Sequence, residues 1–316
     1  MSTANWQWVA LAMGVHTAGI SLKAVRWRAL FLPLQIPLAQ AWMVSMVGQM
    51  LNTALPARAG DVGRILLIGE EKNEASWAMA LSTVVTEKVV DLTMLALLYL
   101  IVALWLTTTP TGLPDWLQTA GRLLIPLALL ALACLLLLAY YGRPIWRFVS
   151  KGLGWLPPRW RTKIDSLANQ AIAGLDALRH GPARRQVWGW SLAIWAIMAW
   201  TNALLFKAFD LDLSLFVAAL LLVVLMSAIS VPRLPGSQGV LVYLCILVLS
   251  LFGVSRETAL LYGITLQAVV HFPVLVLGLI GMFWTSRSLA TQQHQDRGSG
   301  QIQDRRRHDA YDHDGD

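Results

Sequence analysis

The sequence LPARAG at residues 55–60 recurs in the second half of the chain as LPGSQG at residues 234–239. Each copy interrupts a long apolar stretch, and a polar pair follows inside the next apolar stretch. The pairs stand at nearly equal distances: Glu87 and Asp91 lie 32 and 36 residues after Leu55, and Gln267 and His271 lie 33 and 37 residues after Leu234. This spacing indicates an internal repeat, with a chance recurrence of a common loop pattern as the alternative. In an apolar protein, two broken helices in corresponding positions point to a site built where they meet.

The composition is that of a membrane protein, because 56% of the residues are apolar and only 14% are charged. Several segments satisfy the requirement of roughly 20 mostly apolar residues for a spanning helix: 78–106, 120–141, 187–206, 213–231 and 258–284. Shorter or interrupted apolar segments run over 5–22, 34–54 and 239–252. No cleavage site of small residues follows the first segment, so we expect it to be retained. We predict an all-α polytopic integral membrane protein with a membrane domain over residues 1–286.

Basic residues in the loops indicate how the chain is oriented, since Lys and Arg are in excess on the cytoplasmic side. The loop 142–185 carries nine Lys and Arg residues, whereas 107–121 carries none. With 142–185 inside, the segment 34–54 starts and ends on the cytoplasmic side, which predicts a re-entrant hairpin with its turn at 55–60. The second half predicts the same hairpin with opposite polarity. We therefore expect two inverted-topology repeats, at about 5–141 and 187–286, although full crossings at 34–54 and 213–231 remain an alternative.

Two further segments complete the predicted organisation. Apolar residues recur at helical spacing over 161–179, which predicts an amphipathic helix on the cytoplasmic interface. The segment 287–316 has almost no apolar residues and is predicted to be a disordered cytoplasmic tail.

Composition also argues against several kinds of partner. The two cysteines lie in apolar runs without metal-ligand spacing, so no metal site and no cofactor are expected. The net charge of +7 comes from basic residues in loops beside apolar segments, so we expect no nucleic acid.

The first interruption carries a cluster of polar residues: Asn52, Arg58, Gly60, Asp61 and Arg64. Arg58, Asp61 and Arg64 are spaced by three, which on a helix brings them to one face. Because guanidinium groups fork onto phosphate oxygens, Arg58 and Arg64 are candidates for holding a lipid phosphate. A short helix that starts near Gly60 would also direct free backbone N–H groups toward the same place.

The next helix carries a second cluster, Glu87, Lys88 and Asp91. A charge within a membrane span costs roughly 2.5–3.5 kcal/mol, so these side chains are expected to face a polar cavity or a partner. We expect Arg58 or Arg64 to be that partner, with a purely structural charge network as the alternative. In the second half, Gly239, Gln267 and His271 are candidates for lining the same cavity, although a histidine on an apolar helix is also typical of simple packing.

These residues carry a resemblance to a known family, and the matching positions run from Arg26-Trp27-Arg28 through Asn52, Leu55-Pro56, Arg58, Gly60-Asp61, Arg64, Glu87-Lys88 and Asp91 to Pro235-Gly236, Gly239 and Gly253-Val254. Over most of residues 20–285 the chain resembles the membrane region of lysylphosphatidylglycerol synthases, which stand-alone flippase-like proteins share. The resemblance implies a role in moving or accommodating phospholipids or isoprenoid-linked glycolipids in the cytoplasmic membrane. It carries functional roles over to Arg58, Asp61, Arg64, Glu87 and Asp91.

The chain departs from the family pattern in three places. Members often carry a glutamate where this chain has Val242. Many members have a further helix before the Arg-Trp-Arg element. In this chain that element begins at Arg26, and too few residues precede it for the further helix. The full synthases append a soluble aminoacyl-transferring domain, and without it we expect no lysine transfer.

Our leading hypothesis is a non-enzymatic transporter that translocates an anionic or phosphate-bearing lipid across the bacterial inner membrane. Arg58 and Arg64 would neutralise the headgroup, and Glu87 and Asp91 would hold those arginines when the site is empty. The alternative is a non-transporting accessory protein that docks an envelope-biosynthesis enzyme. A membrane-embedded transferase or hydrolase is less well supported, because no nucleophile with a nearby base and no HExxH string are present.

Overall fold

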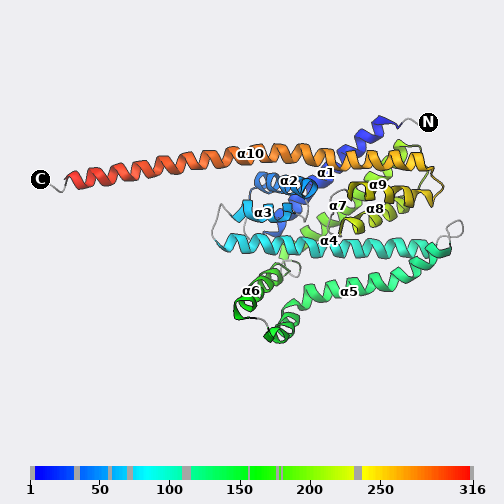
Figure 1. Ribbon diagram of the computed structural model, residues 1–316, viewed down its shortest axis with the longest axis horizontal. Coiled ribbons are helices and arrows are strands. Elements are labelled where there is room, and N and C mark those ends of the chain that lie inside the picture. Colours follow the sequence, from blue (N-terminus) through cyan, green and yellow to red (C-terminus); the bar gives the residue numbers. More distant parts are fainter. Residues whose placement is uncertain are drawn as a thin grey trace.

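The computed structural model describes residues 4–31, 36–55, 59–69, 74–108, 115–155, 157–175, 178, 181–230 and 237–313. Every regular element in these ranges is helical. In chain order the elements are α1 (Trp6–Leu30), α2 (Leu38–Ala54), α3 (Ala59–Gly69), α4 (Glu74–Thr108), α5 (Asp115–Gly152), the 3-10 turn η1 (Leu153–Trp155), α6 (Pro158–Leu175), α7 (Gly181–Ala208), α8 (Leu215–Ser230), α9 (Ser237–Ser250) and α10 (Arg256–His313) (Figure 1).

Five of these helices are long and apolar enough to cross a membrane: Trp6–Leu30, Met79–Thr108, Gln118–Gly152, Ala183–Ala208 and Arg256–Trp284. The predicted class, an all-helical polytopic membrane protein, is confirmed. One predicted segment needs correction. The first apolar segment, expected to end near residue 22, continues as a helix to Leu30. The apolar segment 213–231 contains the short helix α8, which has 16 residues.

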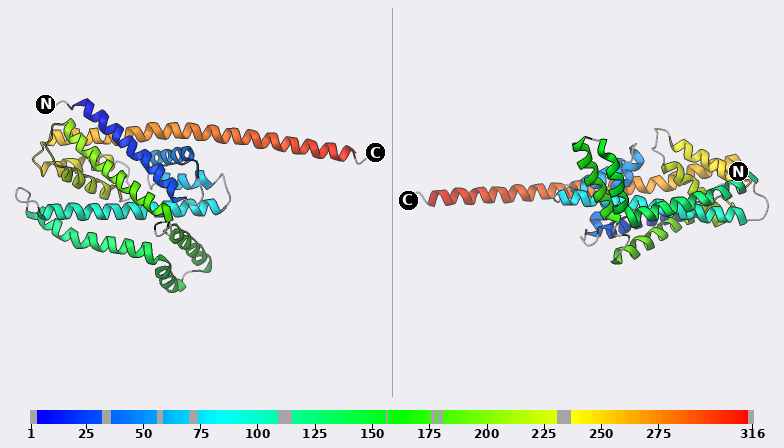
Figure 2. Two further views of the ribbon diagram at one scale, coloured as in Figure 1. Left: turned by 180° about the vertical axis from the view of Figure 1, so that it is seen from behind. Right: turned by 90° about the horizontal axis from the view of Figure 1, so that it is seen from below.

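The order of helix lengths occurs twice along the chain. A long helix, two short ones and another long one follow each other as α1 to α4, and again as α7 to α10. Figures 1 and 2 show the short pairs α2–α3 and α8–α9 toward opposite ends of α4. Residues 56–58 and 231–236, where the sequence places the two hairpin turns, lie outside the described residues. The inverted repeats and the re-entrant hairpins stay predictions.

Close helix contacts bind the two halves together. Helix α1 packs along α7, and α10 packs along α2. Small residues allow the second contact, because a Cβ atom on Gly278 would overlap the Met50 side chain. A large apolar core joins α1, α7, α8, α9 and α10, with Phe206 and Tyr262 fully buried at its centre. The halves therefore form one packed unit around the site described below.

Helix α5 bends at Tyr141, where the backbone leaves helical geometry (φ −118°, ψ 19°). Pro144 explains this bend, because proline lacks an N–H and its ring clashes with the carbonyl four residues earlier. Helix α6 follows and overlaps the amphipathic helix that the sequence predicts at 161–179. It begins at Pro158, since proline is well suited to the first helical position. Its place at the membrane interface stays a prediction.

Helix α10 continues through His313, and its apolar part ends at Trp284. The disordered cytoplasmic tail over 287–316 stays a prediction. Figure 1 shows the C-terminal part of α10 extending beyond the other helices.

Candidate functional site

A network of six charged side chains joins three helices. It consists of the cations Arg26 (α1), Arg64 (α3) and Lys88 (α4) and the carboxylates Asp61 (α3), Glu87 and Asp91 (α4). The nitrogen–oxygen distances are 3.1 Å for Arg26–Glu87, 2.6 Å for Arg26–Asp91, 2.9 Å for Arg64–Glu87, 2.8 Å for Arg64–Asp61 and 2.9 Å for Lys88–Asp61. Glu87 lies at the centre, since each of its oxygens accepts from a different arginine.

The network shows which arginine pairs with Glu87, and it adds a further arginine that was not expected there. Arg64 is a partner of Glu87, as one of the two predicted alternatives, while Arg58 lies outside the described residues. Asp91 is held by Arg26 rather than by an arginine of the first interruption. Arg26 also donates to Ser191 Oγ of α7 at 3.1 Å, so the network reaches the second half.

Trp27 packs against one of the two arginines, Arg64. Its side chain is fully buried, and its indole N–H donates to Thr83 Oγ1 at 3.1 Å. The guanidinium carbon of Arg64 lies 5.1 Å from the centre of the Trp27 ring, within the range of a cation–π contact. Arg64 is therefore held on one side by the ring and at its terminal nitrogens by two carboxylates.

Asn52 fixes the start of α3. Its Oδ1 accepts the N–H of Gly60 at 2.9 Å, and its Nδ2 donates to Asp61 Oδ1 at 3.1 Å. Of the backbone N–H groups at the start of this helix, that of Gly60 is therefore taken by the Asn52 side chain. Gly60 is required here for another reason: a Cβ atom at this position would overlap the backbone carbonyl of Gly48 in α2.

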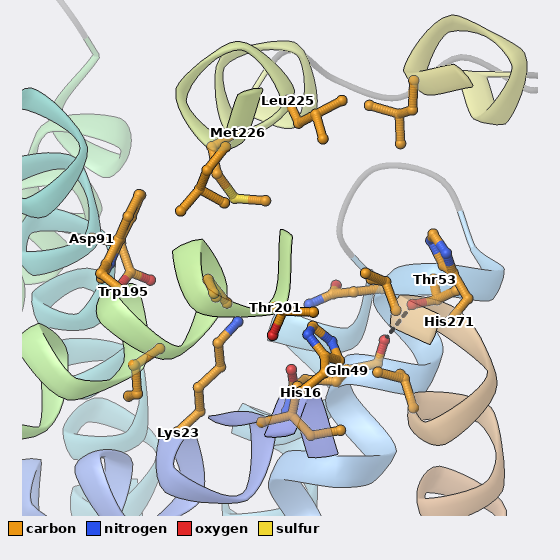
Figure 3. Close-up of a pocket in the computed structure, with 18 of the residues that line it drawn as sticks. His16, Lys23, Gln49, Thr53, Asp91, Trp195, Thr201, Leu225, Met226 and His271 are labelled. Atoms are coloured by element: carbon orange, nitrogen blue, oxygen red, sulfur yellow. Dashed lines mark hydrogen bonds between the residues drawn. The ribbon is translucent and has the colours of Figure 1, made fainter. Parts of the chain in front are cut away.

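A cavity of about 490 Å³ lies against the network. Most of the predicted site residues line it: Asn52, Asp61, Arg64, Glu87, Lys88, Asp91, Gln267 and His271. Both halves contribute, since α7, α8 and α10 supply apolar wall residues such as Trp195, Leu225 and Met226 (Figure 3). The side chains of Lys88 and Asp91 remain 34% exposed at this wall.

Two predicted residues lie outside the cavity wall. Gly60 stands behind it, at the contact of α3 with α2. Gly239 lines a second, more open hollow with Thr53, Gln267 and His271. The Nδ1 of His271 lies 2.9 Å from the backbone carbonyl oxygen of Gln267, one helical turn earlier.

Sequence reasoning missed several polar residues that the structure brings to the site, among them His16, Lys23, Arg26, Ser45 and Gln49. Arg26 was placed in a cytoplasmic loop because the apolar stretch was taken to end near residue 22. A usable signal was present, since His16, Lys23 and Arg26 follow each other at intervals of seven and three residues. That spacing puts them on one face of a helix.

This arrangement defines a class: a polytopic helical membrane protein whose two halves enclose a cavity with charged groups on one wall. The model of the family called lysylphosphatidylglycerol synthase TM region matches residues 1–278, and the chain belongs to this family. The resemblance carried by the sequence motifs is thereby confirmed. Comparison with curated proteins gives no significant match, and comparison with solved structures gives none.

Proposed function

We propose that the protein is a flippase-like, non-enzymatic transporter that translocates an anionic or phosphate-bearing lipid or glycolipid across the bacterial inner membrane. The family supports the coarser statement that this is a membrane protein of lipid synthesis or transport. The observation that carries the proposal is a cavity with ionic groups on one wall and apolar groups on the other, at the place where the two halves meet.

The size of the cavity favours a headgroup as its occupant. Small-molecule sites typically measure about 300–1,000 Å³, and a cavity of about 490 Å³ falls within this range. A phosphoglycerol or sugar-phosphate group fits such a volume, whereas two acyl chains do not. The chains would stay in the bilayer while the headgroup crosses through the protein.

The repeated helix order supports transport by alternating access. Transporters with inverted repeats bind substrate near the midplane, between short or broken helices, and open to each side in turn. The short pairs α2–α3 and α8–α9 lie toward opposite ends of α4 and flank the cavity (Figure 1). In this proposal the loop 142–185 and the C-terminus are cytoplasmic, and Glu87 and Asp91 hold Arg64 and Arg26 in the empty site.

A test of transport needs the whole chain in liposomes. We expect a fluorescent phosphatidylglycerol to exchange between leaflets faster with the protein than in protein-free vesicles, as followed by chemical quenching of the outer leaflet. Asp91→Asn, which removes a partly exposed cavity charge, should slow exchange, while Glu257→Asn on the exposed first turn of α10 should not. Exchange no faster than in protein-free vesicles would refute the proposed function.

A second candidate function is a non-transporting accessory role for an envelope-biosynthesis enzyme. The projecting end of α5, with η1 and α6, favours it, because Trp155 and Trp160 are exposed there at 81% and 61% (Figure 2). Copurification of such an enzyme, its loss on Trp155→Ala and Trp160→Ala, and the absence of lipid exchange would together favour this role over transport.

A further inference from the structure

One cation of the cavity wall, Lys23, takes no part in the ion-pair network. The network is balanced in itself, with three cations and three carboxylates. Lys23 of α1 also lines the cavity and points into it in Figure 3. Its Nζ forms no hydrogen bond and no ion pair with any residue that the structure describes. Among the described residues, the network and the cavity wall together hold four cations and three carboxylates, and Lys23 is the cation that no carboxylate pairs.

Asp91 is paired with Arg26, through its Oδ1 at 2.6 Å, and not with Lys23. Since an unpaired ammonium is costly inside a membrane protein, such a group is expected to have a partner during function. An anion in the cavity supplies that partner.

Two hydrogen-bonding groups of α2 line the same cavity as Lys23. Ser45 of α2 is 1% exposed, and its Oγ has no partner among the described residues. Gln49, one turn further along α2, has a buried Nε2 in the same condition. Both residues line the cavity, and Figure 3 shows Gln49 beside His16. Buried polar atoms are normally satisfied, so two unsatisfied ones in the same cavity as an unpaired cation mark a place for a polar ligand.

We propose that Lys23, Ser45 and Gln49 form an anion subsite that binds the phosphate oxygens of the transported headgroup. This inference rests on the proposed function and names the part of the cavity that recognises the substrate. In this proposal Arg64 acts differently from the sequence-based hypothesis, in which it neutralises the headgroup, and Arg26 acts in the same way as Arg64. Their terminal nitrogens are committed to carboxylates, so they are positioning residues that hold α1 and α3 against α4.

Binding of soluble ligands tests the subsite without requiring transport. Calorimetry on the purified full chain in detergent would compare dihexanoylphosphatidylglycerol, dihexanoylphosphatidylcholine and inorganic phosphate. We expect the wild type to prefer phosphatidylglycerol over phosphatidylcholine, and Lys23→Met to weaken phosphatidylglycerol binding roughly tenfold or more, the effect of losing a charge-assisted hydrogen bond. Lys23→Arg should retain most of the affinity.

Controls separate the subsite from general charge effects. Lys207→Met removes an exposed cation of α7, which lies over the Trp8 ring, and should leave binding unchanged. Gln49→Met should weaken binding severalfold and stands in for Lys23→Met if that variant does not fold. Binding of inorganic phosphate that also depends on Lys23 would identify free phosphate as an occupant, whereas dependence only for the lipid would identify the headgroup.

The outcomes that overturn the subsite differ from those that overturn transport. Anionic lipid that binds folded Lys23→Met or Gln49→Met as tightly as it binds the wild type would overturn the subsite, and so would the absence of anion binding by the wild type. Binding that depends on Lys23, combined with no lipid exchange in liposomes, would refute transport and leave the subsite standing.

Discussion

Replacing Glu87 by glutamine leaves two buried arginines with one carboxylate fewer between them. Glu87 is 5% exposed and accepts from Arg26 at 3.1 Å and from Arg64 at 2.9 Å. Removing one member of a buried ion pair costs about 3–5 kcal/mol, because the other charge stays buried without compensation. We expect Glu87→Gln to destabilise the protein by about that amount, and Arg64→Met to do the same from the other side.

The double variant Glu87→Gln, Arg64→Met decides whether this reasoning holds. With both groups gone, Arg26 can still pair with Asp91, and Lys88 with Asp61, so no charge in the network is left over. The double variant should therefore cost about as much as one single variant, which gives a coupling of roughly 3 kcal/mol.

Equilibrium unfolding in mixed micelles of a mild detergent and sodium dodecyl sulfate would measure these free energies. Glu257→Gln, on an exposed turn, serves as the control and should change the free energy of unfolding by no more than about 0.5 kcal/mol. Two single variants whose effects simply add in the double variant would show that the two charges do not compensate each other, and would refute the reasoning.

Three further predictions concern the first interruption and the topology. Gly60→Ala should destabilise the protein by about 1–3 kcal/mol, because the new methyl group overlaps a backbone carbonyl of α2. The control Gly14→Ala meets no neighbouring atom and should be neutral or slightly stabilising. Thermal unfolding measures both variants, and a melting temperature of Gly60→Ala at or above that of the wild type would contradict the prediction. Asn52→Ala removes the acceptor of the Gly60 N–H and should cost about 1 kcal/mol in the same measurement, a prediction that an unchanged melting temperature would contradict. In a background without native cysteines, Ala57→Cys should react with an impermeant thiol reagent from one face of the membrane, and Ser237→Cys should react from the opposite face. Labelling of Ala57→Cys only from the periplasm would exclude the first hairpin.

The sequence predicted the helical membrane class because a spanning helix needs only length and apolar content, and both are visible in one dimension. It also found Asp61, Arg64, Glu87 and Asp91, whose spacings of three and four residues lie within single helices. Such spacings put side chains on one face whatever the tertiary fold does. These local patterns are the part of the site that a single sequence can reveal.

Arg26 shows where that reasoning stops. Its partners Glu87 and Asp91 lie 61 and 65 residues away, so no local pattern links them. Its charge also suggested a loop, because a basic residue after an apolar run normally marks the cytoplasmic end of a span. Tertiary pairing changed the outcome: with two carboxylates and Ser191 around it, the guanidinium can stay buried, and α1 continues to Leu30. Only the packing of α1 against α4 and α7 makes that visible.

The two halves divide the cavity unequally, and this division bears on how the protein could move. Every charged residue of the described cavity wall comes from α1, α3 or α4, whereas the described wall residues of α7 to α10 are apolar or neutral polar groups and His271. The second half thus contributes no carboxylate to the wall, in keeping with Val242 at the position where family members often carry a glutamate. Among the described residues, the hydrogen bond that joins the network to the second half runs from Arg26 to Ser191. A rocking motion of α8, α9 and α10 past a headgroup held at Lys23 would therefore break no ion pair of the network. We expect the first half to act as the fixed, charged side of the site and the second half as the sliding, apolar side.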